Sequence, residues 1–411
     1  MKDKEFFSRV LGLAEPWRVK EVRLDLEGKR VDVEIECRAG EVWAGQDGRR
    51  LHIHGWEQRQ WRHLDTMQLE TIIGCRVPRV VDPETGATVM VEVPWAAGPR
   101  SRWTLLFEAW AVQVLEAVPA LSRACGLLGI DWHAARAIKQ RAVERGLERR
   151  AQEQGAIEHI GIDEKSFGKG QDYISCAVDI DGRRVLEVVA GRTQEAAAEL
   201  LRKALPEPGA RAGVRAACID MWAAFEAALG EVLPQADIVF DPFHVVSHAG
   251  KAVDEVRRAE HRRLAAEGAS VLKGTRQLWL WGREKLDREQ RRELGRLLEA
   301  DLNTGLAWAL KEDLRRLWDF KRPSAARDFL DTWLAKAEAS GLAPVKRVAA
   351  MIASHLPGVM AWFWHRISNG VAEGFNSAIQ AIKSSARGFR NFANYRIAIL
   401  CHRGGLQLFP H

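Results

Sequence analysis

The sequence is poor in cysteine, and the six cysteines are scattered so that no two of them form a CxxC pair. Neither a disulfide framework nor an intact zinc site is therefore visible. No uninterrupted apolar stretch is long enough to span a bilayer, and the first residues, MKDKEFFSRVLGLAEPW, lack the apolar core of a signal peptide. Gly-rich phosphate-binding loops of the common types are also absent. We expect reduced thiols, no membrane partner and a cytoplasmic location.

The composition is that of a globular chain with more than one domain. Its 411 residues exceed what one ordinary hydrophobic core organises, so two or three domains are expected. The net charge of +6 is a modest basic excess, which allows a polyanionic partner without requiring one.

Tryptophan is unusually abundant, with 16 residues, many of them late in the chain. Packing inside long helices is the favoured interpretation, and a surface that stacks on unpaired bases is the alternative. The late tryptophans are Trp279, Trp281, Trp308, Trp318, Trp333, Trp362 and Trp364.

The first 150 residues divide into a strand-rich part and a helical part. The segment KEVRLDLEGKRVDVEIEC alternates apolar and polar residues around a Glu-Gly turn, which predicts a hairpin in a small β module over residues 1–100. Residues 101–150 read as helices, with Gly126 and Gly129 at an expected turn and Asp131 as an expected N-cap. A short helix, a turn and a second, basic helix give the outline of a helix-turn-helix, although any helical hairpin would look similar.

Residues 151–250 predict the order β-β-β-α-β-α-β-α. Three strands in a meander followed by alternation is the order of the ribonuclease H fold, and it differs from the strict alternation of a nucleotide-binding doubly wound sheet. Residues 251–365 read as an all-α insertion, and residues 366–411 return to the ribonuclease H-like domain with a helix from Asn369 to Ser385. The expected fold class is therefore α/β.

Aspartates come at the ends of three predicted strands: Asp163, Asp220 and Asp241. In a sheet of this order the first strand lies beside the fourth, so Asp163 and Asp220 should emerge at the same edge. Two neighbouring carboxylates repel unless a cation bridges them, and carboxylate oxygens are the ligands that Mg²⁺ prefers. Taken singly, each acid is better explained as a turn or cap residue. The pair in this strand order favours a metal site.

Glu373 lies on the last predicted helix with Asn369 and Asn376 at helical spacing. A lone helical acid is usually a solvated residue. Beside two strand-end acids it becomes a candidate third ligand, and the two amides could orient its carboxylate or contact DNA without adding negative charge.

The segments GIDEKSFGKGQDYISCAVDIDGRRVLEVVAGRT, CIDMWAAFEAAL and ISNGVAEGFNSAIQAIKSSARGFRN together resemble bacterial insertion-sequence DDE transposases, most closely the ISL-three family. The resemblance covers nearly the whole chain. It implies that Asp163, Asp220 and Glu373 are the three catalytic acids and metal ligands. Asp241 and His244 match a D-x-x-H element shared with Mutator-like transposases, where a structural histidine is equally compatible.

The resemblance implies a transposase that uses Mg²⁺ or Mn²⁺. It would bind the terminal inverted repeats of its element, cut the DNA by hydrolysis and join 3′ ends to target DNA by transesterification. Its partner would be double-stranded DNA, as a homodimer in the nucleoid. The candidate DNA-binding residues are Arg136, Lys139, Arg141, Arg257, Arg258, Lys383, Arg387 and Arg390.

Two other functions remain open from the sequence. A transposase-derived DNA-binding protein without catalysis is favoured slightly by an eroded cysteine pattern and opposed by the retained acids. A structure-selective nuclease on the same fold is opposed by the large helical insertion.

The sequence departs from the family at its zinc-binding module. Cys37 remains in ECRAGEV without its partner, and Asp82 stands where a cysteine is expected. Cys75, His52, His54 and His63 do not supply four ligands at a usable spacing, so we expect no structural zinc.

Overall fold

The structure is a computed structural model, and it separates into two compact units. Unit 1 comprises Met1–Gln152, Ser384–Gly388 and Leu406–His411, and unit 2 comprises Glu153–Lys383 and Phe389–Gly405. The residues that the structure describes are 3–38, 43–44, 50–51, 53–81, 86–98, 100–153, 155–168, 173–300 and 302–410.

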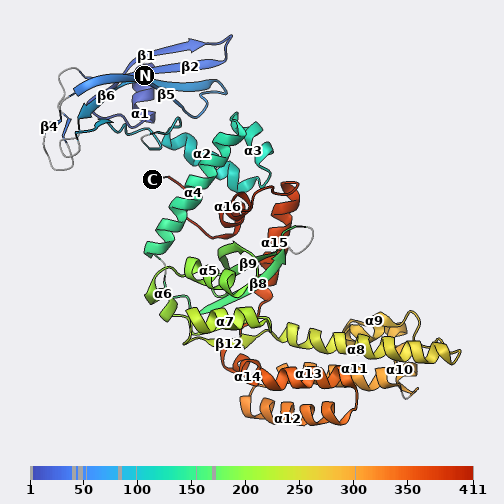
Figure 1. Ribbon diagram of the computed structural model, residues 1–411. Coiled ribbons are helices and arrows are strands. Elements are labelled where there is room, and N and C mark those ends of the chain that lie inside the picture. The colour runs from blue at the N-terminus through green and yellow to red at the C-terminus, as the bar shows by residue number, and fades with distance from the viewer. Residues whose placement is uncertain are drawn as a thin grey trace. The chain divides into compact units, whose positions relative to one another are not determined.

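Unit 1 begins with a β module whose main sheet has the order β1-β2-β6-β5, with β7 paired to β6 (Figure 1). The predicted hairpin is confirmed, because β1 and β2 pair antiparallel and the Gly28 N–H donates to Asp25 Oδ1 at 2.8 Å in the turn between them. β2 and β6 pair in parallel, which the sequence pattern did not indicate. The bounds are α1 Asp3–Val10, β1 Trp17–Asp25, β2 Arg30–Cys37, β3 Trp43–Ala44, β4 Arg50–Leu51, β5 Ile53–Arg62, β6 Glu70–Val81 and β7 Thr88–Met90.

Aromatic rings form much of the core of this module. Trp95 meets Trp17 and Trp61 edge to face, with ring centroids 5.1 and 5.6 Å apart. Nearby, the buried His63 ring contacts Thr104 Oγ1 at 2.9 Å through Nδ1, and Thr104 also caps the first helix of the next segment. Burial and the charge of Arg62 lower the pKa of His63 to about 4, so its ring is neutral at physiological pH.

Three helices follow the β module in unit 1: α2 Leu105–Ala117, α3 Leu121–Leu128 and α4 Trp132–Glu153, whose last residue belongs to unit 2. Gly126 lies inside α3, whereas Gly129 has φ +64° and forms the turn, which only a residue without a Cβ adopts readily. Asp131 accepts the Ala134 N–H at 2.9 Å and starts α4 as predicted.

Unit 2 contains the sheet β10-β9-β8-β11-β12. β10, β9 and β8 are antiparallel neighbours, whereas β8, β11 and β12 run parallel. The predicted neighbourhood of the first and fourth strands is therefore confirmed. The bounds are β8 His159–Ser166, β9 Tyr173–Asp179, β10 Arg184–Ala190, β11 Ala216–Ile219 and β12 Asp237–Phe240.

Short helices surround this sheet. α5 packs on β9, β10 and α7, and α16 packs on β10. Their bounds are α5 Gln194–Ala204, α6 Pro208–Ala212, α7 Ala223–Val232, α15 Gly370–Ser385 and α16 Phe392–Arg403.

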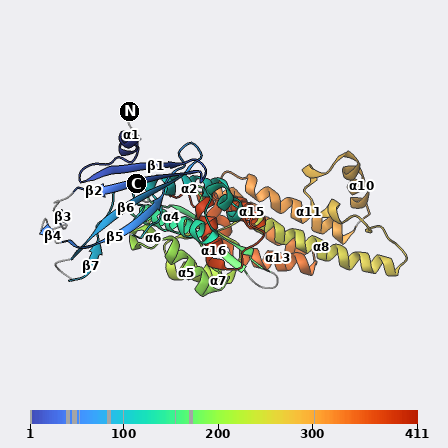
Figure 2. The same ribbon diagram turned by 90° about the horizontal axis from the view of Figure 1, so that it is seen from above.

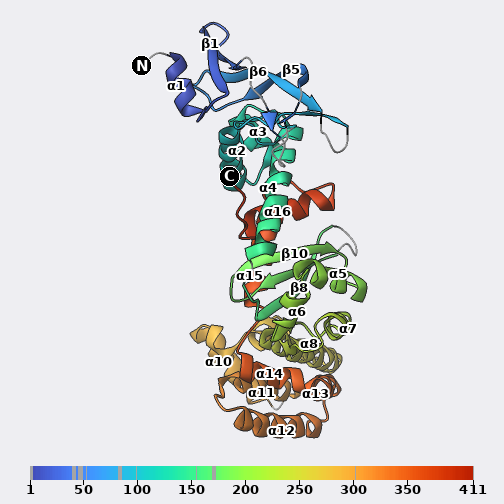
Figure 3. The ribbon, with the colours of Figure 1, turned by 90° about the vertical axis from the view of Figure 1, so that its left-hand side faces the viewer.

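Between β12 and α15 the chain is helical, as predicted. α8 packs against α11 and α13 (Figure 2), and Figure 3 shows α11, α13 and α14 between α8 and α12. The bounds are α8 Pro242–Ala266, α9 Arg276–Leu280, η1 Arg283–Lys285, α10 Arg288–Leu298, α11 Asn303–Arg315, η2 Arg316–Asp319, α12 Pro323–Ala339, α13 Ala343–Ser354 and α14 Leu356–His365.

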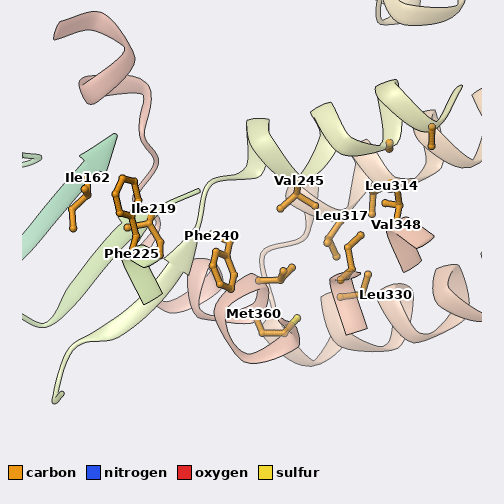
Figure 4. Close-up of a cluster of buried hydrophobic side chains, with 14 of the residues drawn as sticks. Ile162, Ile219, Phe225, Phe240, Val245, Leu314, Leu317, Leu330, Val348 and Met360 are labelled. Carbon is orange, nitrogen blue, oxygen red and sulfur yellow. The ribbon is translucent and has the colours of Figure 1, made fainter. Parts of the chain in front are cut away.

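One hydrophobic cluster runs from the sheet into this helical segment (Figure 4). Phe240 of β12 and Met360 of α14 both belong to it, and α14 packs directly on β12. Among the late tryptophans, Trp279 and Trp333 are buried as expected, whereas Trp364 is 65% exposed and contradicts the core-packing interpretation. Within the described parts of the chain, no helix is long and apolar enough to cross a membrane.

Candidate active site

Asp163 and Asp220 lie at the same level of the sheet because of its register. Cys218 of β11 pairs with Gly161 of β8, and continuing this register brings Asp220, just past β11, level with Asp163. Asp163 does not end its strand, as the sequence suggested, because β8 continues to Ser166 along β9. On this side of β8 the parallel partner β11 ends at Ile219, so Asp163 lies beyond the paired part of the two strands.

Asp163 is a buried carboxyl with a raised pKa. Its side chain is 8% exposed and accepts the Glu164 N–H at 2.7 Å and the Asn376 amide at 2.6 Å. Burial, and then the negative charge of Asp220, raise the pKa of Asp163 to about 7. The carboxyl is therefore held in one orientation while its charge is only partly compensated.

His244 joins the other two strand-end acids. Asp241 is the N-cap of α8, and His244 lies in the first turn of that helix. The ring Nδ1 of His244 is 2.6 Å from Asp220 Oδ1 and 3.2 Å from Asp241 Oδ2. Burial acts to lower the pKa of His244, but the hydrogen bonds and charges of both aspartates raise it to about 10, so the ring is a cation at neutral pH.

α15 brings Glu373 to the same place. Asp241, His244 and Glu373 each offer a ligand atom within 4.8 Å of the others, the one such group found in the described part of the chain. Burial and the charge of Asp241 raise the pKa of Glu373. The structure thus places Glu373 closest to the D-x-x-H element, and Asp163 and Asp220 adjoin this group.

The two amides expected around Glu373 fasten α15 to the sheet. The Asn369 side chain donates to the Ile162 carbonyl at 3.0 Å, and the Asn369 N–H donates to Asp241 Oδ1 at 3.0 Å. Asn369 is fully buried, so it does not contact DNA in this arrangement. Asn376 binds Asp163 directly, as described above.

Sequence reasoning missed two residues beside the acids. Arg192 donates to Glu164 Oε1 at 3.0 Å, and its guanidinium lies over the rings of Tyr173 and Trp222. No motif marks Arg192, which comes from a loop after β10. Trp222 could have been noticed, because it lies only two residues after Asp220.

The expected DNA-binding residues fall into two groups. Lys139 and Arg257 are 6% and 9% exposed, and Arg141 pairs with the buried Glu108 at 2.7 Å. Burial leaves Lys139 and Arg257 little surface to offer a phosphate, whereas Arg141 remains partly exposed beside Glu108. Arg258, Arg387 and Arg390 are exposed, and Arg136 and Lys383 are partly exposed.

Three of these residues have side-chain contacts, and the Arg136 guanidinium carbon lies 5.9 Å from the Trp132 ring centroid. Lys383 donates to the Phe167 carbonyl and lies over the Phe167 ring, and Arg258 pairs with Asp254 at 3.3 Å.

The residues expected to have lost the zinc site are only partly covered by the structure. His52 and Asp82 lie outside the described residues. Cys75 is fully buried, and burial raises the pKa of its thiol to about 12, so the thiolate that zinc requires is disfavoured. His54 is exposed, whereas the ring of His63 is bonded to Thr104.

Comparison with known proteins identifies the class. A family model described as a transposase, of the DDE type, matches residues 160–399, and a model described as the zinc-finger of transposase IS204/IS1001/IS1096/IS1165 matches residues 45–81. These matches place the chain among the insertion-sequence transposases.

Curated relatives agree along most of the chain. The transposase for insertion sequence element IS1001 of Bordetella parapertussis is 30% identical over 370 residues, which cover 89% of each protein. The transposase for IS1557 of Mycobacterium tuberculosis is 29% identical over 426 residues, covering 95% of this chain and 93% of that protein. The chain belongs to the ISL3 (ISL-three) family, as its motifs indicated.

The zinc-finger match weighs against the expectation that structural zinc is absent. The matched segment, residues 45–81, retains one cysteine, Cys75. Residues 45–81 are therefore related to the zinc-finger of these transposases, but they contain only one cysteine that could bind zinc.

Proposed function

We propose that this transposase cleaves DNA at the terminal inverted repeats of its element and joins the 3′ ends to target DNA, with Asp163, Asp220 and Glu373 as the catalytic acids. The observation that carries the proposal is the convergence of acids from β8, β11, β12 and α15 on one place in unit 2. His244 bridges Asp220 and Asp241, which leaves the charges of Asp163 and Glu373 for a bound cation to compensate.

The donor set suits a hard divalent cation. Aspartate and glutamate oxygens predominate, which is the chemistry that Mg²⁺ and Mn²⁺ select. Burial, and then the charge of Asp220, raise the pKa of Asp163, and a bound cation would offset both effects. When bound, such ions activate water or a 3′-hydroxyl and stabilise the leaving oxygen of a phosphodiester.

The protein's own groups hold the acids in place. Asn376 and the Glu164 N–H fix both oxygens of Asp163. The protonated His244 keeps Asp220 and Asp241 together against their mutual repulsion. Asn369 ties the start of α15 to both β8 and Asp241, which sets the position of Glu373 one turn later.

The strand order supports a ribonuclease H-like domain formed by residues 151–250 and 366–411, interrupted by the helical residues 251–365. The helices of residues 101–150 are proposed as a helix-turn-helix, and residues 1–100 as a second DNA-binding module. The partly exposed Arg136 on α4 would contact phosphates, and the exposed Arg258 on α8 of the helical segment would do the same. A homodimer is proposed because two transposon ends must be processed together.

A strand-transfer assay tests the proposal. End-repeat DNA is incubated with the protein and Mg²⁺, and cleaved and joined products are separated by size. The wild type should give both products and Asp163→Asn neither. Equal absence of products from both, with DNA binding retained, would instead support a transposase-derived DNA-binding protein. Cleavage of branched DNA without preference for end repeats would support a structure-selective nuclease.

A further inference from the structure

Two exposed aromatic side chains follow the acids at equivalent positions. β11 and β12 are parallel neighbours in which Ile219 pairs with Phe240. Each strand is followed by an aspartate and, two residues later, by an aromatic residue: Trp222 after Asp220 and Phe243 after Asp241. Trp222 is 42% exposed and Phe243 is 65% exposed. Core packing does not explain exposed apolar rings beside these two carboxyls.

Trp222 is held rigidly despite its exposure. Its indole Nε1–H donates to the Arg192 carbonyl at 3.3 Å. The Arg192 guanidinium carbon lies 5.1 Å from the Trp222 ring centroid and 3.9 Å from that of Tyr173. Glu164 anchors the same guanidinium through the 3.0 Å ion pair. Tyr173, Arg192 and Trp222 therefore form a fixed group, which we name the aromatic platform.

The platform has the chemistry of a stacking site. Its polar N–H group is satisfied, so what Trp222 presents to solvent is apolar ring. Indole and guanidinium planes both stack on nucleobases, whatever the base. An apolar protein side chain would make no use of the guanidinium.

We propose that the aromatic platform binds an unpaired nucleobase of the DNA next to the bond that is cut. The inference rests on the proposed function for the identity of the polymer. Bases inside a duplex are already stacked and paired, so the occupant must be unpaired or extruded from the helix. The two-residue separation of Trp222 from Asp220 places the platform beside the acids, where the nucleotide adjoining the cleaved phosphate would lie.

The test is a binding measurement without divalent metal, so that it does not depend on cleavage. Two labelled DNAs carry the same end repeat, one fully paired and one with three unpaired nucleotides at the junction with flanking DNA. Fluorescence anisotropy in EDTA gives the affinity of each. A 2-aminopurine among the unpaired nucleotides reports stacking through quenching.

Wild type should bind the unpaired DNA more tightly than the paired DNA and quench the 2-aminopurine. Trp222→Ala should weaken binding of the unpaired DNA by about 5- to 150-fold, the range that loss of one base–aromatic stack gives, and abolish the quenching. Its affinity for paired DNA should change by no more than about twofold, within the range of a lost surface contact. Trp222→Phe should retain most of the preference, and Trp364→Ala, which removes a more exposed tryptophan from α14, should behave as wild type.

Equal affinities of Trp222→Ala and wild type for the unpaired DNA would overturn the proposal. The proposal would also be overturned if wild type did not bind the unpaired DNA or did not prefer it over the paired DNA. An equal loss of affinity for both DNAs in Trp222→Ala would overturn it as well. Cleavage is scored separately with Mg²⁺. A wild type that fails to cut but shows the Trp222-dependent preference refutes the proposed function alone, and one that cuts without that preference refutes the platform alone.

Discussion

The pKa of Asp163 depends on the burial of its carboxyl and on the charge of its neighbours. Its pKa of about 7 lies above the ordinary value of 3.8 because the group is buried and faces Asp220. The folded state therefore holds a proton between about pH 4 and pH 7 that the unfolded state has lost. By linkage, the free energy of unfolding falls as pH rises through this window.

Replacing the ionisable carboxyl of Asp163 by a neutral amide should consequently stabilise the metal-free protein at high pH. We expect Asp163→Asn to raise the free energy of unfolding by about 2–4 kcal/mol at pH 8, with the difference vanishing near pH 4. Thermal unfolding in EDTA between pH 4 and pH 8 measures this. Asp328→Asn, which alters an exposed acid on α12, should show no such pH-dependent gain. A less stable Asp163→Asn at pH 8 would contradict the argument.

Glu373 provides the sharpest test of catalysis at a single residue. Glu373→Gln keeps the shape of the side chain and removes its charge, so binding of end-repeat DNA should persist. Cleavage should fall at least about 100-fold, because a metal ligand supplies several kcal/mol of transition-state stabilisation. Gel-based binding and cleavage assays on the same DNA separate the two effects.

The control for this variant is Glu293→Gln, an exposed helical acid on α10. It should cleave as wild type does. Unchanged cleavage by Glu373→Gln would remove Glu373 from the set of catalytic acids.

At the scale of elements, the contact between α14 and β12 depends on one glycine. A Cβ at Gly358 would lie 2.5 Å from Phe240 Cε2 and 3.1 Å from the Ile238 carbonyl oxygen. The helix can approach the strand only because this side chain is missing.

We expect Gly358→Ala to lower the free energy of unfolding by about 1–3 kcal/mol, the usual cost of overpacking. Gly295→Ala is the matched control, since a Cβ there meets nothing within 4 Å in α10. That change should stabilise by about 0.5–1 kcal/mol through helix propensity. Chemical denaturation of both variants would show shifts of opposite sign, and a neutral Gly358→Ala would indicate that α14 can move away.

The elements themselves were largely predictable, and their cross-contacts were not. Alternation and turn residues gave the strands of the sheet, and the helical spacing of Asn369, Glu373 and Asn376 gave α15. The continuation of β8 past Asp163 was missed, because strand pairing with β9 is a non-local interaction. The bridge from His244 to both Asp220 and Asp241 was equally hidden, since a D-x-x-H spacing also describes an ordinary helix cap. Arg192 carries no local signal at all, because its partners come from separate segments.

At the scale of the whole molecule, unit 1 is assembled from both ends of the chain. Leu408 is 1% exposed in unit 1, and its carbonyl accepts from Arg145 at 2.8 Å, while Arg149 donates to the Phe409 carbonyl at 2.7 Å. Gly146 of α4 lies against Leu406 and Leu408, where a Cβ would come within 3.3 Å of both side chains.

Removing residues 406–411 should therefore loosen α4. We expect its amides to exchange hydrogen at least about tenfold faster, since a buried leucine and charged hydrogen bonds each contribute more than about 1.4 kcal/mol. Hydrogen–deuterium exchange with mass spectrometry measures this, and the amides of β9 in unit 2 serve as the internal control. Unchanged exchange in α4 would show that the C-terminal residues cover unit 1 without stabilising it.

The helical segment between β12 and α15 affects how the acids come together as the chain folds. Asp163, Asp220 and Asp241 belong to strands that are close in sequence, whereas Glu373 follows more than 120 residues after Asp241. Closing so long a loop by chance is entropically costly, but a segment already folded through its own local contacts brings its two ends back to the sheet together. Glu373 thus depends for its place on helices that supply none of the three proposed catalytic acids. A destabilising substitution in the core of that segment would delay or prevent the docking of Glu373. The sheet would then be ordered and carry its aspartates without the glutamate.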